Sequence, residues 1–284
     1  MRRSSFGSMT AWGAALMAMF LLTPFVAAQS RHPATEIAPF DRKLLERAAK
    51  LYYSTRATGL QGFDCAVHPD WPGIFSSTRQ GKPGTANDPH IALLNTVKIT
   101  LHARLGGGST LDWQVPADRS ATLDASSKRM LDQMHEGLGQ QFQGVMQLWT
   151  LFSNGDLVPT PEENPDLTQT GSGYRIHTEQ KGEWLTELFS RELVLERFEA
   201  SSGGSKLDIA PTFKPSEKGL LVNSYVAHIQ PRGGPAGQTQ EMHVTLSYQT
   251  VSGFPILGRV AVEMPRVGAF NFMLDGCSVR HAGK

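Results

Sequence analysis

The sequence has little net charge and few of the patterns that identify a particular chemistry. Its 284 residues carry 27 Lys and Arg against 26 Asp and Glu, a formal net charge of +1. Nucleic acid is not expected as a partner, because it attracts proteins with a basic surface. The 9 histidines are scattered, with no spacing typical of zinc ligands. We therefore predict no metal site and no cofactor.

Catalytic motifs are also lacking. There is no G-x-S-x-G, and the Gly run at 106–108 is not followed by the Gly-Lys-Ser/Thr of a phosphate loop. Acidic residues lie close together at Glu162-Glu163 with Asp166 and at Glu192 with Glu196, and paired carboxylates serve glycoside hydrolases. On a Pro-rich loop or a strand edge such carboxylates are normally solvated. We predict no catalytic residue, and a secreted hydrolase is only the third functional hypothesis.

Residues 1–28 have the features of a secretory signal peptide. Arg2 and Arg3 form a basic start, an apolar run extends from Ala11 to Leu22, and small residues precede a predicted cut after Ala28. An uncleaved anchor is the alternative, because the apolar stretch is nearly long enough to span a bilayer. No later run approaches that length. The sequence therefore predicts a soluble periplasmic or secreted protein with no stable membrane span after cleavage.

The chain has only two cysteines, Cys65 and Cys277. In an exported protein an even number of cysteines most simply forms disulfides. A Cys65–Cys277 bridge would join the first predicted strand to the last. Two buried thiols are the alternative interpretation.

Alternation of apolar and polar residues predicts an antiparallel sheet. Short turns between successive strands favour a meander over a parallel arrangement. Residues 184–200 are predicted as strand, although their apolar spacing fits a helix equally well. The other predicted strands are 63–67, 97–103, 111–115, 174–180, 220–229, 242–251, 254–264 and 269–281, the last with a bulge at Gly276.

Apolar residues at three- and four-residue spacing predict two helices. The first begins at Asp41, as its N-cap, and runs to about Ala57; the second runs from about Ser127 to Ser153 with a continuous apolar stripe. Residues 71–89 are rich in Gly, Pro and Ser, which predicts an exposed loop.

The Pro-rich segment 154–173 is predicted to be a long connector. It could divide two domains, but the same strand alternation continues on both sides. We favour a single domain over 29–284. The predicted fold class is α+β, with a curved antiparallel sheet, or half-barrel, covered by one or two long helices.

The candidate site is apolar. A sheet with one hydrophobic face, crossed by a helix with an apolar stripe, either packs solid or leaves a cavity for an apolar ligand. Large or adaptable side chains suit an irregular pocket. The predicted ligand-binding residues are Leu101, Trp113, Met134, Leu138, Phe142, Trp149, Val244, Leu246 and Tyr248.

The order of these parts resembles the periplasmic lipoprotein-carrier (LolA-like) family. The C-terminal segments GLLVNSYVAHI and VTLSYQTVSGFPILGRVAVEMP carry the resemblance, and Ser247 to Glu263 is similar to a recurrent strand-Gly-Pro-strand passage of that family. The resemblance implies an open half-barrel, capped by helices, that holds the acyl chains of a lipoprotein. The family's gating arginine has no assignable counterpart here. The 154–173 insert and the predicted disulfide depart from the family pattern.

The leading hypothesis is a non-enzymatic exported protein that binds an apolar ligand between sheet and helix. The ligand would be an acyl chain or the lipid moiety of a lipoprotein. The alternative is an extracytoplasmic interaction or scaffold protein with a solid core and no ligand. Its exposed loops, 71–89 and 154–173, would then bind an envelope protein.

Overall fold

The computed structural model describes residues 39–78, 88–105, 108–121, 123–160, 163, 165–180, 182–232, 239–265 and 268–282. The predicted signal peptide at 1–28 lies outside these ranges, as do Glu162 and residues 79–87 of the loop expected at 71–89.

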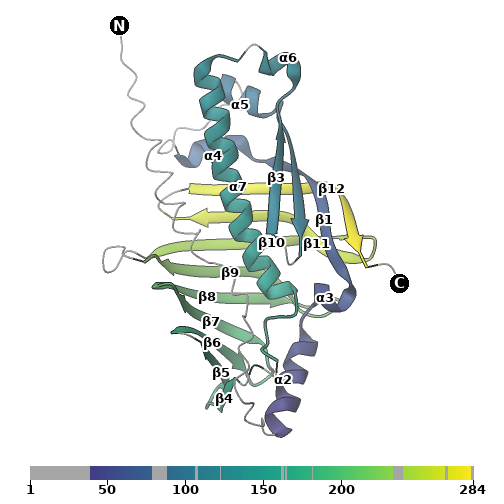
Figure 1. Ribbon diagram of the computed structural model, residues 1–284, viewed down its shortest axis with the longest axis vertical. Helices are drawn as coiled ribbons and strands as arrows, with labels where there is room; N and C mark the ends of the chain where they lie inside the picture. Colours follow the sequence, from purple (N-terminus) through teal and green to yellow (C-terminus); the bar gives the residue numbers. More distant parts are fainter. Residues whose placement is uncertain are drawn as a thin grey trace.

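The fold is one antiparallel sheet of 12 strands in the order β3-β2-β1-β12-β11-β10-β9-β8-β7-β6-β5-β4 (Figure 1). The sheet is curved and not closed, since β3 and β4 are its two edges. The predicted fold class is therefore confirmed. The strands are β1 (Leu60–Pro69), β2 (Lys98–Arg104), β3 (Gly108–Gln114), β4 (Asp166–Gln169), β5 (Gly173–Gln180), β6 (Glu183–Ser190), β7 (Leu195–Ser202), β8 (Ser205–Lys214), β9 (Leu221–Gln230), β10 (Gln240–Val251), β11 (Phe254–Met264) and β12 (Gly268–His281).

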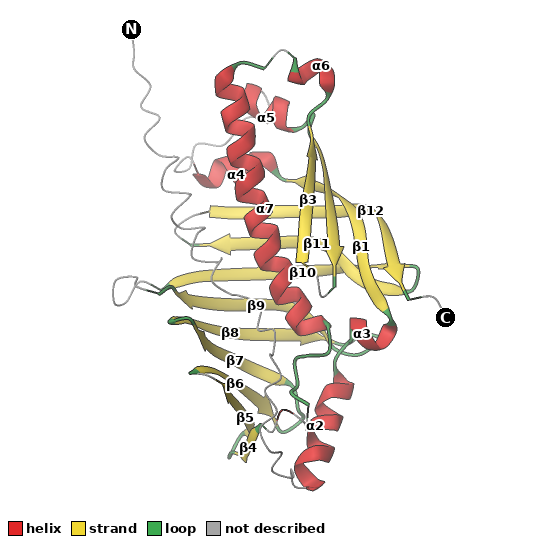
Figure 2. Ribbon diagram, in the orientation of Figure 1, coloured by secondary structure: helices red, strands yellow, loops and turns green. Residues whose placement is uncertain are grey.

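One long helix, α7 (Ala125–Ser153), crosses the sheet diagonally (Figures 1 and 2). Asp124 caps it by accepting a hydrogen bond from the Ser127 amide at 2.7 Å, so the predicted helix is confirmed with two more residues at its start. The shorter helices are α2 (Pro39–Leu51), α3 (Thr55–Thr58), α4 (Trp71–Thr78), α5 (Pro89–Leu94) and α6 (Ala117–Ser120).

The predicted strands are confirmed, including the ambiguous segment 184–200, which forms β6 and β7. The bulge at Gly276 is also present, because β12 places an extra residue between Asp275 and Ser278 opposite β1. The structure adds two strands that were not predicted, β4 and β8. β4 belongs to the segment expected to be a connector.

The first predicted helix is wrong at both ends. It begins at Pro39, which places Asp41 inside the first turn and not at the N-cap. It ends at Leu51, because the backbone there pairs with Leu220: the Leu220 amide donates to the Leu51 carbonyl at 2.7 Å, and the Tyr53 amide donates to the Leu220 carbonyl at 3.0 Å. A tertiary contact thus replaces the helical hydrogen bonds.

The loop predicted at 71–89 is wrong for its first half, which forms α4. Pro72 and Gly73 lie in the first turn, where a proline is tolerated because its missing amide would have no helical partner. Asp70 accepts a hydrogen bond from the Gly73 amide at 3.1 Å, and Trp71 and Ile74 are buried. The helix forms because it covers apolar surface next to β12.

Candidate ligand site between helix α7 and the sheet

The structure brings all nine predicted ligand-binding residues into one apolar core. They come from α7 and from the sheet face that α7 covers, which we call the inner face. Trp113, Met134 and Tyr248 are half-buried. The other six are buried, namely Leu101, Leu138, Phe142, Trp149, Val244 and Leu246.

Aromatic contacts hold α7 against the inner face at several strands. The His135 ring stacks on Trp113 of β3, with centroids 5.4 Å apart. About two turns later, Phe142 contacts Phe272 of β12, with centroids 4.6 Å apart. The last turn places Phe152 against Tyr225 of β9 at 5.9 Å. Because α7 contacts β3, β12 and β9, this single element joins strands that are far apart in the sheet order.

Five buried polar side-chain atoms lack a hydrogen-bond partner among the described residues, and this is the unusual feature of the core. An unpaired buried donor or acceptor is rare in folded proteins and destabilises them. Two of the residues, Trp113 and Trp149, were predicted site residues, whereas the other three were missed. The atoms are Tyr53 Oη, Trp113 Nε1, Gln141 Oε1, Trp149 Nε1 and Tyr225 Oη.

Three of these groups lie around Tyr248 of β10, near the C-terminal end of α7. They belong to Tyr53, Trp149 and Tyr225. The Tyr248 hydroxyl donates to the Val222 carbonyl at 2.7 Å. The Trp149 indole lies beside that hydroxyl without reaching hydrogen-bond geometry. Burial raises the pKa of both Tyr248 and Tyr225. The nearby phenol of Tyr53 raises the pKa of Tyr248 further, and the phenol of Tyr248 raises that of Tyr225. These groups are therefore neutral hydrogen-bond donors at any physiological pH.

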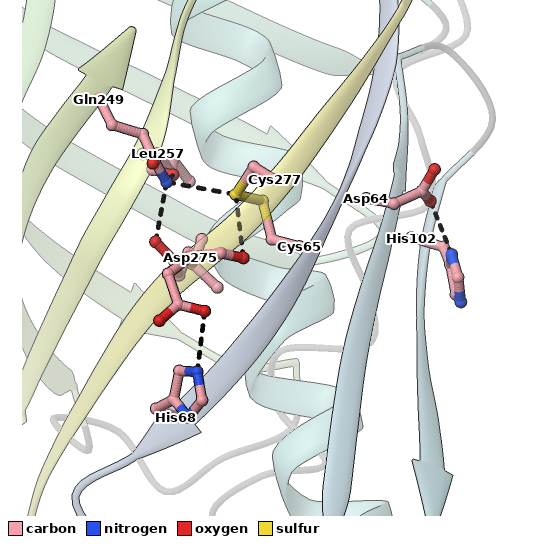
Figure 3. The surroundings of a disulfide bond; sticks show 9 residues. Asp64, Cys65, His68, His102, Gln249, Leu257, Asp275 and Cys277 are labelled. Atoms are coloured by element: carbon pink, nitrogen blue, oxygen red, sulfur yellow. Dashed lines mark hydrogen bonds and ion pairs between the residues drawn. A yellow bond between two sulfur atoms is a disulfide. The ribbon is translucent and has the colours of Figure 1, made fainter. Parts of the chain in front are cut away.

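The predicted disulfide is present: Cys65 of β1 and Cys277 of β12 are bonded. Figure 3 shows the amide of Gln249, from β10, next to this bridge. Its Nε2 donates to the Leu274 carbonyl at 2.8 Å and lies 3.2 Å from Cys277 Sγ. The side chain and the disulfide together connect β10, β12 and β1. A disulfide is typical of extracytoplasmic proteins.

Two His–Asp pairs flank the disulfide (Figure 3). His102 Nδ1 lies 2.6 Å from Asp64 Oδ1, and His68 Nε2 lies 2.9 Å from Asp275 Oδ1. Arg280 also bonds Asp64. These pairs tie neighbouring strands together. No group of three or more metal-ligating side chains occurs in the part of the chain that the structure describes.

A buried carboxyl lies elsewhere on the sheet. Glu187 of β6 is 2 % exposed and stands between Ile176 of β5 and Phe198 of β7. Burial raises its pKa well above the usual carboxyl value, and the nearby Glu163 raises it further. The described acidic residues that were considered for a hydrolase are all exposed, namely Glu163, Asp166, Glu192 and Glu196. Sequence reasoning missed Glu187, whose only signal is an acidic residue at an apolar position of an alternating strand.

Within the described ranges, no helix is long and apolar enough to cross a membrane. No protein-family model and no curated protein matches this chain. One solved structure, described as an outer membrane lipoprotein-sorting protein domain from Vibrio parahaemolyticus, aligns with 84% of this chain and 93% of that chain at 9% identity. Its TM-score of 0.26 is too low to carry an argument about function.

Proposed function

We propose that this chain is a non-enzymatic, extracytoplasmic protein that binds an apolar ligand, an acyl chain or the lipid moiety of a lipoprotein, between α7 and the inner face. The observation that carries the proposal is the set of unpartnered polar atoms along the α7–sheet interface. Trp113, Gln141, Trp149 and Tyr225 each bury one such atom there. An apolar site with a few convergent polar groups is typical of ligand-binding sites.

The energetics favour an interface that can open. Each unpaired buried polar group costs about 1–3 kcal/mol relative to a paired one. Contacts such as Phe142 with Phe272 stabilise the closed arrangement. A ligand that covers the inner face with its acyl chain would replace the apolar contacts of α7. It would also offer acceptors to the indole and phenol groups.

Two glycines in the middle of α7 support movement of this helix. A methyl group added at Gly137 or Gly139 would meet no atom within 4 Å beyond the neighbouring backbone of α7 itself, so packing does not require glycine at either position. Glycine in a helix interior is about 1 kcal/mol less favourable than alanine. The sequence between His135 and Phe142 therefore weakens α7 where it passes from β3 to β12. We propose that this segment bends when ligand enters.

Binding of a fluorescent fatty acid, together with native mass spectrometry of protein isolated from a bacterial envelope, tests the proposal. We expect one bound acyl ligand per chain. Leu138→Asp should abolish binding, whereas Glu136→Ala, on the exposed side of the same helix, should not. Melting curves must show that Leu138→Asp still folds. Ligand-free protein that takes up no fatty acid would contradict the proposal.

The direct ring contacts of α7 favour one alternative, a scaffold protein with a solid core. In that case the aromatic interface at Phe142 and Phe272 is purely structural, and partners would bind the loops. Leu138→Asp separates the two functions. If folded Leu138→Asp protein loses acyl binding and keeps its envelope partners, the ligand hypothesis holds; if the wild type captures partners but no acyl ligand, the scaffold hypothesis holds.

A further inference from the structure

Two lysines lie over aromatic rings where the β8–β9 turn meets the β10–β11 turn. Lys214 Nζ lies 5.0 Å from the centroid of the Tyr248 ring, and Lys218 Nζ lies 5.1 Å from that of Phe254. Lys218 also donates to the Gly253 carbonyl, which joins the two turns. His281 stacks on Phe254 at 5.6 Å. We call Lys214, Lys218, Phe254 and His281 the basic rim.

Neither lysine of the basic rim has a carboxylate partner among the described residues. Two arginines elsewhere on the surface do have one: Arg56 pairs with Asp156, and Arg197 with Asp208. Cation–π contacts hold the ammonium groups in place without neutralising them. The basic rim therefore presents two ammonium groups that lie over aromatic rings and form no ion pair with a described residue.

Tyr248 connects the basic rim with the interior. Lys214 lies over its ring, and the unpartnered indole N–H of Trp149 lies beside its hydroxyl. Lys214 is half-buried and Trp149 is fully buried, so this one phenol separates a surface charge from the core. A ligand that enters along Tyr248 would pass from a positive rim to an apolar interior with neutral donors.

We infer that the basic rim binds the anionic headgroup, a phosphate or a carboxylate, of an amphiphile whose acyl chain lies along α7. The inference rests on the proposed function and deepens it, because it names the charge of the ligand and the end at which it enters. Electrostatic attraction to Lys214 and Lys218 would select anionic over neutral amphiphiles. Because Lys218 is exposed and Lys214 is only half-buried, salt should weaken this selectivity.

Competition binding with three probes tests the inference. The probes are a lysophosphatidic acid, a monoacylglycerol with the same acyl chain, and inorganic phosphate. We expect the wild type to bind the anionic amphiphile about tenfold more tightly than the neutral one at low salt. The double variant Lys214→Gln/Lys218→Gln should lose this preference and keep monoacylglycerol binding. Lys214→Arg/Lys218→Arg, which retains both charges, should keep the preference.

Lys206→Gln/Lys128→Gln removes two positive charges away from the rim, one at the opposite end of β8 and one in α7, and should behave like the wild type. If the wild type binds both amphiphiles equally, the inference is overturned and the proposed function stands. If inorganic phosphate competes as well as the lysophosphatidic acid, the rim is a simple anion site and the inference is overturned. If neither amphiphile binds, the proposed function itself fails.

Discussion

The indole of Trp149 stands nearly perpendicular to the ring of Phe63, with centroids 5.7 Å apart and an interplanar angle of 87°, but its N–H has no acceptor among the described residues. The same contact therefore stabilises the closed helix–sheet interface through its rings and destabilises it through its polar atom. An interface made only to be rigid would pair that donor. This combination is consistent with the proposed exchange of helix contacts for ligand contacts.

Replacing Tyr225 with Phe should stabilise the ligand-free protein. The change removes a buried hydroxyl that has no partner and keeps the ring that contacts Phe152. We expect the free energy of unfolding to rise by about 1 kcal/mol, measured by urea denaturation. Affinity for an acyl ester should fall, because the protein would lose a hydroxyl that can donate a hydrogen bond to the ester carbonyl.

Tyr248→Phe is the matched control, since the Tyr248 hydroxyl is paired. Its loss would remove the hydrogen bond to the Val222 carbonyl and should lower the free energy of unfolding by about 1 kcal/mol. Opposite signs for the two variants are the expected result. Equal destabilisation by both would mean that the Tyr225 hydroxyl is paired in solution.

The comparison of these tyrosines shows why part of the site could not be predicted. Tyr225 and Tyr248 occupy similar positions in alternating strands, and only the folded neighbourhood decides which hydroxyl finds a carbonyl. The apolar stripe that ends at Phe152, by contrast, was readable from spacing alone. Local sequence patterns predicted the strands of the inner face and the helix that covers them. Hydrogen-bond pairing, in contrast, depends on contacts between segments that are distant in the sequence.

The errors in the fold have the same origin. Leu207 and Ile209 alternate as a strand should, but Pro211 interrupts the run, and β8 was missed; the structure accommodates this proline within the strand. The first helix was predicted to continue past Leu51, because nothing in the local sequence indicates that the backbone pairs with Leu220 there. Tertiary contacts override local propensity at both places.

Removal of the disulfide should lower stability without changing the fold. Cys65 and Cys277 are 212 residues apart in sequence, so the bridge restricts a long loop of the unfolded chain. We expect Cys65→Ala/Cys277→Ala to lower the free energy of unfolding by about 2–5 kcal/mol. A reducing agent should affect the wild type similarly and leave the variant unchanged. The far-UV circular dichroism of the folded state should not change, because β1 and β12 remain paired.

Glu187 should make the protein less stable as pH rises. Its pKa is raised in the folded state, mainly by burial, so the folded chain retains a proton that the unfolded chain releases above the usual carboxyl pKa. Stability should therefore fall from that pH up to the folded-state pKa, by at most about 1.4 kcal/mol per pH unit. The facing groups are Glu163 and Tyr52, neither of which supplies a positive charge.

Glu187→Gln should remove this slope, as measured by urea denaturation across the pH range. Glu192→Gln, an exposed carboxyl in the turn after β6, is the control and should leave the slope as in the wild type. Parallel stability curves for the wild type and Glu187→Gln would show that Glu187 ionises normally in the folded protein.

The double variant Gly137→Ala/Gly139→Ala should show whether α7 bends when ligand enters. It should change the free energy of unfolding and the rate of ligand association in opposite directions. Both positions have room for a methyl group, so the double variant should raise the free energy of unfolding by about 1–2 kcal/mol through helix propensity alone. If α7 bends here to admit ligand, the association rate of a fluorescent fatty acid should fall in stopped-flow measurements. Asp132→Ala, on the exposed side of the same helix, also raises helix propensity but lies before the glycines, and it should leave the association rate unchanged. An unchanged rate in the stabilised glycine variant would mean that ligand enters without any bending of α7 at this point.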